Sequence, residues 1–129
     1  MRPATSPTAE RHESLWMLAA SPTLWAAHFG LCYITAAVWC AKAPDALTPL
    51  GTARVAVMIY TIVALAVIGL VGWIGYRAHR FGAEPAPHDA DSPADRHRFM
   101  GLATVLLSGL SALAVVYAAL VVMFIETCQ

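Results

Sequence analysis

The chain has 129 residues, of which 59% are hydrophobic and only 12% are charged, whereas about a quarter of the residues in an ordinary soluble domain are charged. The formal net charge is zero with neutral histidines, so nothing in the composition indicates a nucleic-acid partner. Three stretches, residues 14–41, 55–76 and 99–125, contain no Asp, Glu, Lys or Arg. Each is long enough to supply the roughly 20 apolar residues that cross a bilayer as a helix. We therefore expect an all-α membrane protein, a three-helix transmembrane bundle in contact with membrane lipids.

The N-terminal part of the chain divides in two before the first span. Residues 1–9 are polar and rich in Pro, Ser and Thr, which predicts a disordered tail. Residues 10–21 predict a short amphipathic helix in the membrane interface. Ser21 and Pro22 are typical of a helix start, because serine caps a helix and proline loses no hydrogen bond at the first position. We favour a break there over the alternative, a single helix from Ser14 that bends at Pro22.

The rest of the chain divides by composition into three spans, two loops and a short tail: first span 22–41, external loop 42–52, second span 53–77, cytoplasmic loop 78–95, third span 96–126 and external C-terminus 127–129. Six arginines lie on the side of the N-terminus and second connection: Arg2, Arg11, Arg77, Arg80, Arg96 and Arg98. Only Lys42 and Arg54 lie on the other side. The positive-inside rule therefore predicts a cytoplasmic N-terminus and an external C-terminus.

Polar and aromatic residues recur along one stripe of the first span. They are spaced 3, 4, 3 and 4 residues apart, which places them on one helix face: Trp25, His28, Cys32, Thr35 and Trp39. The opposite face holds mainly Leu24, Ala27, Leu31, Ala37 and Val38. Because buried polar groups in a membrane must face protein partners, we expect this seam to be the face that packs against protein.

His28 lies roughly 9 Å along the helix from Pro22, which we place in the cytoplasmic third of the membrane. The first interpretation is a neutral histidine hydrogen-bonded to a neighbouring hydroxyl, with Thr104 and Ser108 near that depth. The second is a contact to a partner subunit or a lipid headgroup. The third is a haem or copper ligand, with Cys32 and Met100 as further copper ligands. Haem usually requires a second axial ligand, and the other spans contain no interior histidine.

Two cysteines fall at the external ends of the outer spans. Cys40 ends the first span and Cys128 follows the third, and this compartment permits disulfides. We predict a Cys40–Cys128 disulfide, with two free thiols or a metal-binding pair as the alternatives, and we expect Cys32 to stay reduced within the membrane. No nucleotide-binding loop, HExxH motif, paired CxxC motif or Ser/His/Asp set occurs. We therefore expect no catalytic residues, no enzymatic activity and no required cofactor.

Two segments of the chain resemble a known group: "PTLWAAHFGLCYITAAVWCAK" and "RHRFMGLATVLLSGLSALAVVYAALVVMFIETC". The chain resembles small three-span bacterial membrane proteins associated with haem–copper cytochrome c oxidase clusters of the aa3/caa3 type. The matching residues are Pro22, Trp25, His28, Cys32, Tyr33, Trp39, Cys40, Ala41 and Cys128.

The resemblance implies a non-catalytic accessory or assembly protein of the bacterial inner membrane, with oxidase subunits as partners. It assigns no ligand to His28. Two other functions stay open from the residues: a small haem- or copper-handling membrane protein that uses His28, and a homo-oligomeric membrane protein without a ligand.

Overall fold

The computed structural model of the chain describes residues 7–45, 47, 49–80 and 93–128, and they form three helices. These are α1 (Pro7–Lys42), α2 (Gly51–Arg80) and α3 (Pro93–Phe124). Each of the three contains a segment long and apolar enough to cross a membrane: Leu15–Lys42, Gly51–Arg80 and Arg98–Phe124. The expected all-α bundle of three membrane-spanning helices agrees with this structure.

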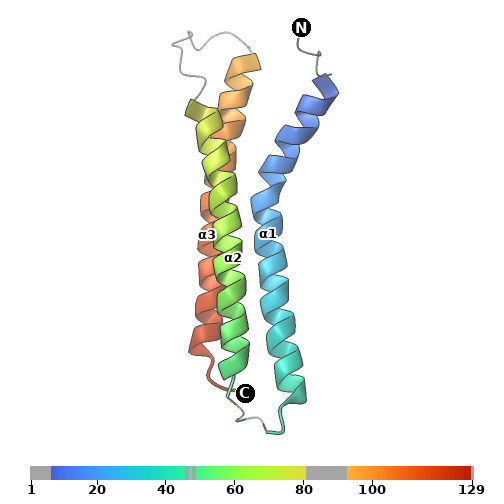
Figure 1. Cartoon of the computed structure of the whole chain (residues 1–129), viewed down its shortest axis with the longest axis vertical. Helices are drawn as coiled ribbons and strands as arrows, with labels where there is room; N and C mark the ends of the chain where they lie inside the picture. Colours follow the sequence, from blue (N-terminus) through green and yellow to red (C-terminus); the bar gives the residue numbers. More distant parts are fainter. Residues whose placement is uncertain (1–6, 46, 48, 81–92, 129) are drawn as a thin grey trace.

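The helices lie side by side and alternate in direction, so the two ends of the chain lie at opposite ends of the bundle (Figure 1). One end holds Cys40 and Cys128 and is called here the disulfide end. The other holds Arg77, Arg80 and Arg98 and is called here the arginine end. Short connections force this antiparallel order, because a helix must turn back to pack against the one before it.

The expected break at Pro22 is wrong, because α1 is one helix from Pro7 to Lys42 with Pro22 inside it. Proline has no backbone N–H to donate to the preceding turn, which weakens a helix without ending it when the neighbouring turns are intact. The first part of α1 leans away from α2 and α3 (Figure 1), as a proline bend allows. The interfacial placement of residues 10–21 stays a prediction, and the side chains of residues 10–14 lie outside those that the structure describes.

Except at the C-terminal end of the third, the helices extend further into polar sequence than the predicted spans. The second helix occupies 51–80 rather than 53–77, and the third occupies 93–124 rather than 96–126. Residues 7–9 of the predicted tail lie in α1, while residues 1–6 and 81–92, from the predicted tail and loop, lie outside the described residues. Loss of hydrophobicity marks where the lipid ends, whereas backbone hydrogen bonds continue for another turn.

The interior of the bundle is small and contains both apolar and hydroxyl side chains. Ala64, Ile68 and Val115 form its apolar centre, with Leu24, Leu65 and Ala112 packed around them. Towards the arginine end, α2 and α3 approach through small residues, since a Cβ added at Gly72 would lie 3.2 Å from the Cβ of Ser108. Such close approach is how helices gain contact in lipid, where burial of apolar surface gives little driving force.

Candidate functional site

His28 lies inside the bundle, with only 2% of its surface exposed. Its Nε2 atom is 3.0 Å from the hydroxyl oxygen of Thr61 on α2, and the Thr61 hydroxyl donates to the Val57 carbonyl at 2.7 Å. With the one Thr61 hydroxyl proton on the Val57 carbonyl, the matching assignment makes His28 the donor, through Nε2–H. His28 is therefore the neutral tautomer in which Nδ1 carries the free lone pair.

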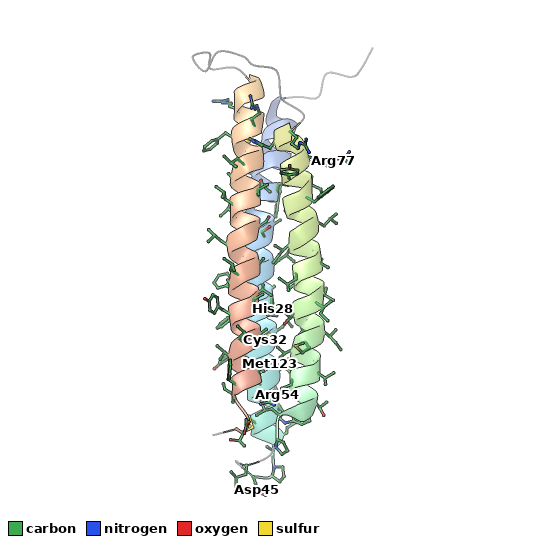
Figure 2. All side chains as sticks on the ribbon, turned by 90° about the vertical axis from the view of Figure 1, so that its left-hand side faces the viewer. His28, Cys32, Asp45, Arg54, Arg77 and Met123 are labelled. Carbon is green, nitrogen blue, oxygen red and sulfur yellow. A yellow bond between two sulfur atoms is a disulfide. The ribbon has the colours of Figure 1, made fainter. Side chains whose placement is uncertain are left out.

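Cys32 lies within contact distance of both nitrogens of the ring and is nearer to Nε2. Its Sγ atom lies 3.9 Å from His28 Nδ1 and 3.5 Å from Nε2. A thiol is a weak donor, and Nδ1 is the ring nitrogen left to accept its proton. The chain of contacts runs from Cys32 through His28 and Thr61 to the carbonyl of Val57, so every polar group in it has a partner. Figure 2 shows His28 and Cys32 one above the other within the bundle.

The interpretation of His28 as a histidine bound to a neighbouring hydroxyl agrees with this geometry, but the expected partners are wrong. The hydroxyl of Ser108 pairs with that of Ser21 at 2.8 Å. The hydroxyl of Thr104 donates to the carbonyl of Met100 at 2.9 Å. The candidate span of α1 is Leu15–Lys42, and His28 lies near its centre. The depth of His28 in the membrane stays a prediction.

The predicted seam is only partly buried. His28 and Cys32 face the interior, but Trp25 is 39% exposed, and Thr35 and Trp39 are only partly buried. The buried stripe instead passes through Ser21, and Leu24, which we placed on the opposite face, packs against the core. A 3, 4, 3, 4 spacing repeats every 3.5 residues, while a straight helix turns every 3.6, so a seam of this kind drifts off the buried face over several turns.

Thr35 and Trp39 lie beside an open groove on α1 near the disulfide end. The groove has a volume of about 540 Å³ and is lined by Ile34, Thr35, Val38, Trp39, Lys42, Ala43 and Pro44. The indole Nε1 of Trp39 is buried and has no hydrogen-bond partner among the described residues. A buried donor without an acceptor is unfavourable in a membrane, which distinguishes this part of α1 from an ordinary lipid-facing surface.

The predicted disulfide is present. Cys40 and Cys128 are bonded, with their Cα atoms 5.5 Å apart, and Cys32 is the free cysteine, buried within the bundle. Near the disulfide, the guanidinium of Arg54 on α2 donates to the carbonyl of Ile125, just beyond α3, at 2.6 Å. A cation at the carboxyl end of a helix satisfies a carbonyl that has no partner within the helix. The bond and this contact connect all three helices at the disulfide end.

The described residues bring together no group of three His, Cys, Asp or Glu side chains. Of the copper ligands considered from the sequence, His28 and Cys32 are adjacent, but Met100 is not. Met100 precedes Gly101, which contacts Gly75. Gly75 lies fourteen residues along α2 from Thr61, or roughly 21 Å at 1.5 Å per residue. Of the three copper ligands considered from the sequence, the structure therefore brings together two, His28 and Cys32.

Thr61 is the functional-site residue that sequence reasoning missed. It is the one Ser or Thr between Arg54 and Arg77, so a search for the hydroxyl partners of a membrane histidine could have found it. The spacing of residues within α1 does not show whether His28 faces α2 or α3. The sequence therefore could not show that its hydroxyl partner lies on α2. The sequence matches no protein-family model, no curated protein and no solved structure.

Proposed function

We propose that the chain is a non-catalytic accessory or assembly subunit of a respiratory membrane complex of the cytochrome c oxidase type. The observation that carries this proposal is the incomplete covering of α1. Of the three candidate spans, that of α1 is the least hydrophobic and has the smallest share of its residues buried in the bundle. A helix that is both less apolar and less covered is the one expected to contact another protein.

The chemistry of the exposed part of α1 fits a protein partner. The groove beside Trp39 offers the Thr35 hydroxyl and the Lys42 ammonium in an otherwise apolar setting. Lipid tails hold no acceptor for these donors, whereas the backbone carbonyls or polar side chains of a partner helix do. Exposed large side chains at matching depths on α2 are aliphatic instead, as at Val55 and Ile59.

The resemblance of the two outer helices to small proteins of oxidase clusters supports the identity of the partner. It also supports a bacterial inner membrane and, together with the arginine count, a cytoplasmic N-terminus. The interior polar network then serves to set the positions of the helices, because each of its members already has a partner within the bundle.

The test is site-specific photo-crosslinking in native membranes. A photoreactive amino acid replaces Ile34 in the groove or, as the matched control, Ile59 on α2; the two isoleucines are 58% and 55% exposed. We expect position 34, and not position 59, to crosslink to a subunit of a haem-containing oxidase, identified by mass spectrometry and absorption. Equal crosslinking at both positions, or migration of the chain only as a free monomer in mild detergent, would refute the proposal. Crosslinks to a second copy of the chain would support a homo-oligomer instead.

A second candidate is a small haem- or copper-handling protein, and one observation favours it. The thiol of Cys32 lies within 3.9 Å of both ring nitrogens of His28, and thiolate with imidazole is a donor set that suits copper(I). Metal binding at Nδ1 would leave the contact between His28 Nε2 and Thr61 in place and would require the Cys32 thiol to lose its proton. The absorption spectrum and metal content of the purified chain separate the two candidates. Stoichiometric copper or a Soret band that disappears in His28→Ala would favour the second.

A further inference from the structure

A cavity lies beside the Cys40–Cys128 disulfide, between the end of α1 and the segment that follows α3. It has a volume of about 260 Å³, and both cysteines of the bond line it. We call it the disulfide cavity. Most of its other wall residues are apolar: Ala36, Ala37, Leu50, Val122 and Ile125. Among the described residues, no charged side chain lines it.

The disulfide cavity gives a small thiol access to the bond. Its volume is several times the roughly 30 Å³ that one water molecule occupies in the liquid. Tyr33, on its wall, is 69% exposed, so the cavity opens at the surface of the bundle. Thiol–disulfide exchange depends on the access of a thiolate to one of the two sulfur atoms. A bond in a closed core meets this condition only after the fold opens, whereas this bond belongs to the wall of a surface cavity.

The disulfide also holds the segment after α3. Ile125 is held separately, because its N–H donates to the carbonyl of Val121 at 3.2 Å and its carbonyl accepts from Arg54 at 2.6 Å. Beyond Ile125, residues 126–128 make no hydrogen bond or ion pair with another described residue. The bond through Cys128 is therefore the specific attachment of this segment to the bundle.

The same bond holds the end of α1. Cys40 lines the disulfide cavity, while Val38, Trp39 and Lys42 line the groove described above. The last turns of α1 therefore form a wall of both hollows. Because helix ends open easily where tertiary contacts are few, loss of the bond at Cys40 should loosen this wall on both sides.

We propose that the Cys40–Cys128 disulfide exchanges with a dithiol that enters the disulfide cavity, and that reduction frees residues 126–128 and loosens the end of α1. The dithiol is uncharged or is carried on an apolar segment, because the wall of the cavity is apolar. This inference stands apart from the proposed function, since it concerns the bond itself and not the partner of the groove.

The exchange has two steps. A thiolate of the dithiol attacks one sulfur of the bond, which forms a mixed disulfide and expels the other cysteine as a thiolate. The second thiol then attacks the mixed disulfide and leaves with the first as a new disulfide. Two electrons pass from the dithiol to the protein, the Cys40–Cys128 bond breaks, and the two protons of the dithiol end on Cys40 and Cys128.

The first test is the rate at which dithiothreitol, an uncharged dithiol, reduces the folded chain in a nonionic detergent. Samples are quenched with a maleimide in denaturant and measured by mass spectrometry, where reduction adds two labels to the one on Cys32. Ala37→Leu narrows the cavity and Tyr33→Ala widens it. The matched control is Ala27→Leu, another exposed alanine of α1 that does not line the cavity.

We expect reduction of Ala37→Leu to be about tenfold slower than that of wild type, or about 1.4 kcal/mol in activation free energy. Tyr33→Ala should react faster than wild type, and the control should react at the wild-type rate. Equal rates for Ala37→Leu and the control would overturn the route through the cavity. So would reduction of wild type only at those fractions of sodium dodecyl sulfate that unfold the helices.

The class of thiol is tested with a matched pair, uncharged 2-mercaptoethanol and anionic 2-mercaptoethanesulfonate. Each rate is divided by the rate of the same thiol with 2-hydroxyethyl disulfide in solution, which removes the intrinsic reactivity. We expect the uncharged thiol to have the higher relative rate, and equal relative rates would contradict an apolar entrance.

The second test is amide hydrogen exchange, which reports whether reduction releases the two segments. Reduced wild type, and Cys40→Ser with Cys128→Ser, should exchange faster than oxidised wild type at residues 37–42 and 125–128. Residues 72–75 of α2, which pack against α3 near the arginine end, should be unchanged and serve as the internal control. Unchanged exchange beside the bond, or equal acceleration at both ends of the bundle, would overturn the proposed release.

Discussion

Replacement of Gly101 by alanine tests how closely α2 and α3 approach at the arginine end. The added Cβ would lie 2.9 Å from the carbonyl oxygen of Gly75 and 3.0 Å from the backbone nitrogen of His79. Both are backbone atoms of α2, which cannot rotate aside as a side chain could. The two helices must therefore separate by several tenths of an ångström along this contact, which also stretches the hydrogen bond from His79 to Arg98.

The expected cost follows from two opposing effects. Crowding of a well-packed contact destabilises by about 1–3 kcal/mol, while alanine in place of glycine stabilises a helix by about 0.5–1 kcal/mol. Gly109→Ala on the same helix isolates the second effect, because no described atom outside its own helical surroundings lies within 4 Å of a Cβ added there. The difference between the two variants should therefore equal the crowding alone, about 1–3 kcal/mol.

The measurement is denaturation of the purified chain by sodium dodecyl sulfate from mild detergent, followed by circular dichroism with the disulfide kept oxidised. We expect Gly101→Ala to unfold at a lower denaturant fraction than wild type, and Gly109→Ala to unfold at the same or a higher fraction. Equal midpoints for the two alanine variants would refute the close contact between Gly75 and Gly101 on which the arrangement of α2 and α3 depends.

Three other changes test the remaining contacts. Cys128→Ser should lower the unfolding midpoint as far as reduction of the wild type does. The loss in the free energy of unfolding is at most about 4–5 kcal/mol, from the chain entropy that the disulfide removes. A reductant should have no further effect on the variant. In a double-mutant cycle, His28→Ala and Thr61→Val should show a coupling of about 0.6 kcal/mol and no more than about 1.7; additive losses would contradict their hydrogen bond. Pro22→Ala should slow amide hydrogen exchange in the preceding turn of α1, because it restores a backbone donor; unchanged exchange would show that the proline does not loosen the helix.

The number of spans and the disulfide could be predicted because they depend on properties that the sequence states directly. Hydrophobic length separates a membrane helix from a soluble one, and an odd number of spans places Cys40 and Cys128 at one end. Three helices in mutual contact then bring their ends within bonding distance. The 5.5 Å between the Cα atoms of the two cysteines also depends on the rotation of α1, which this topology does not fix.

The continuity of α1 through Pro22 could not be predicted, because Ser21 and Pro22 are compatible both with the start of a helix and with the interior of one. Ser21 and Pro22 would cap a new helix well, yet in the bundle Ser21 is buried and hydrogen-bonded to Ser108. The hydrogen bond to Ser108 stabilises Ser21 inside α1, where its hydroxyl does not cap a new helix. Only the position of α3 reveals this, and no local pattern in α1 contains it.

The rotation of α1 about its own axis is the feature that connects the interior of the bundle to its exposed surface. Three contacts along α1 fix that rotation: Ser21 to Ser108 on α3, His28 to Thr61 on α2, and Cys40 to Cys128 after α3. A heptad spacing cannot set this rotation, since one residue of shift exchanges Leu24 for Trp25 at the buried position. With the three contacts in place, the sides of Thr35 and Trp39 that do not touch α2 or α3 must turn outwards into the groove. The polar network therefore holds α1 at the one rotation that exposes this groove, the surface that we propose contacts another membrane protein.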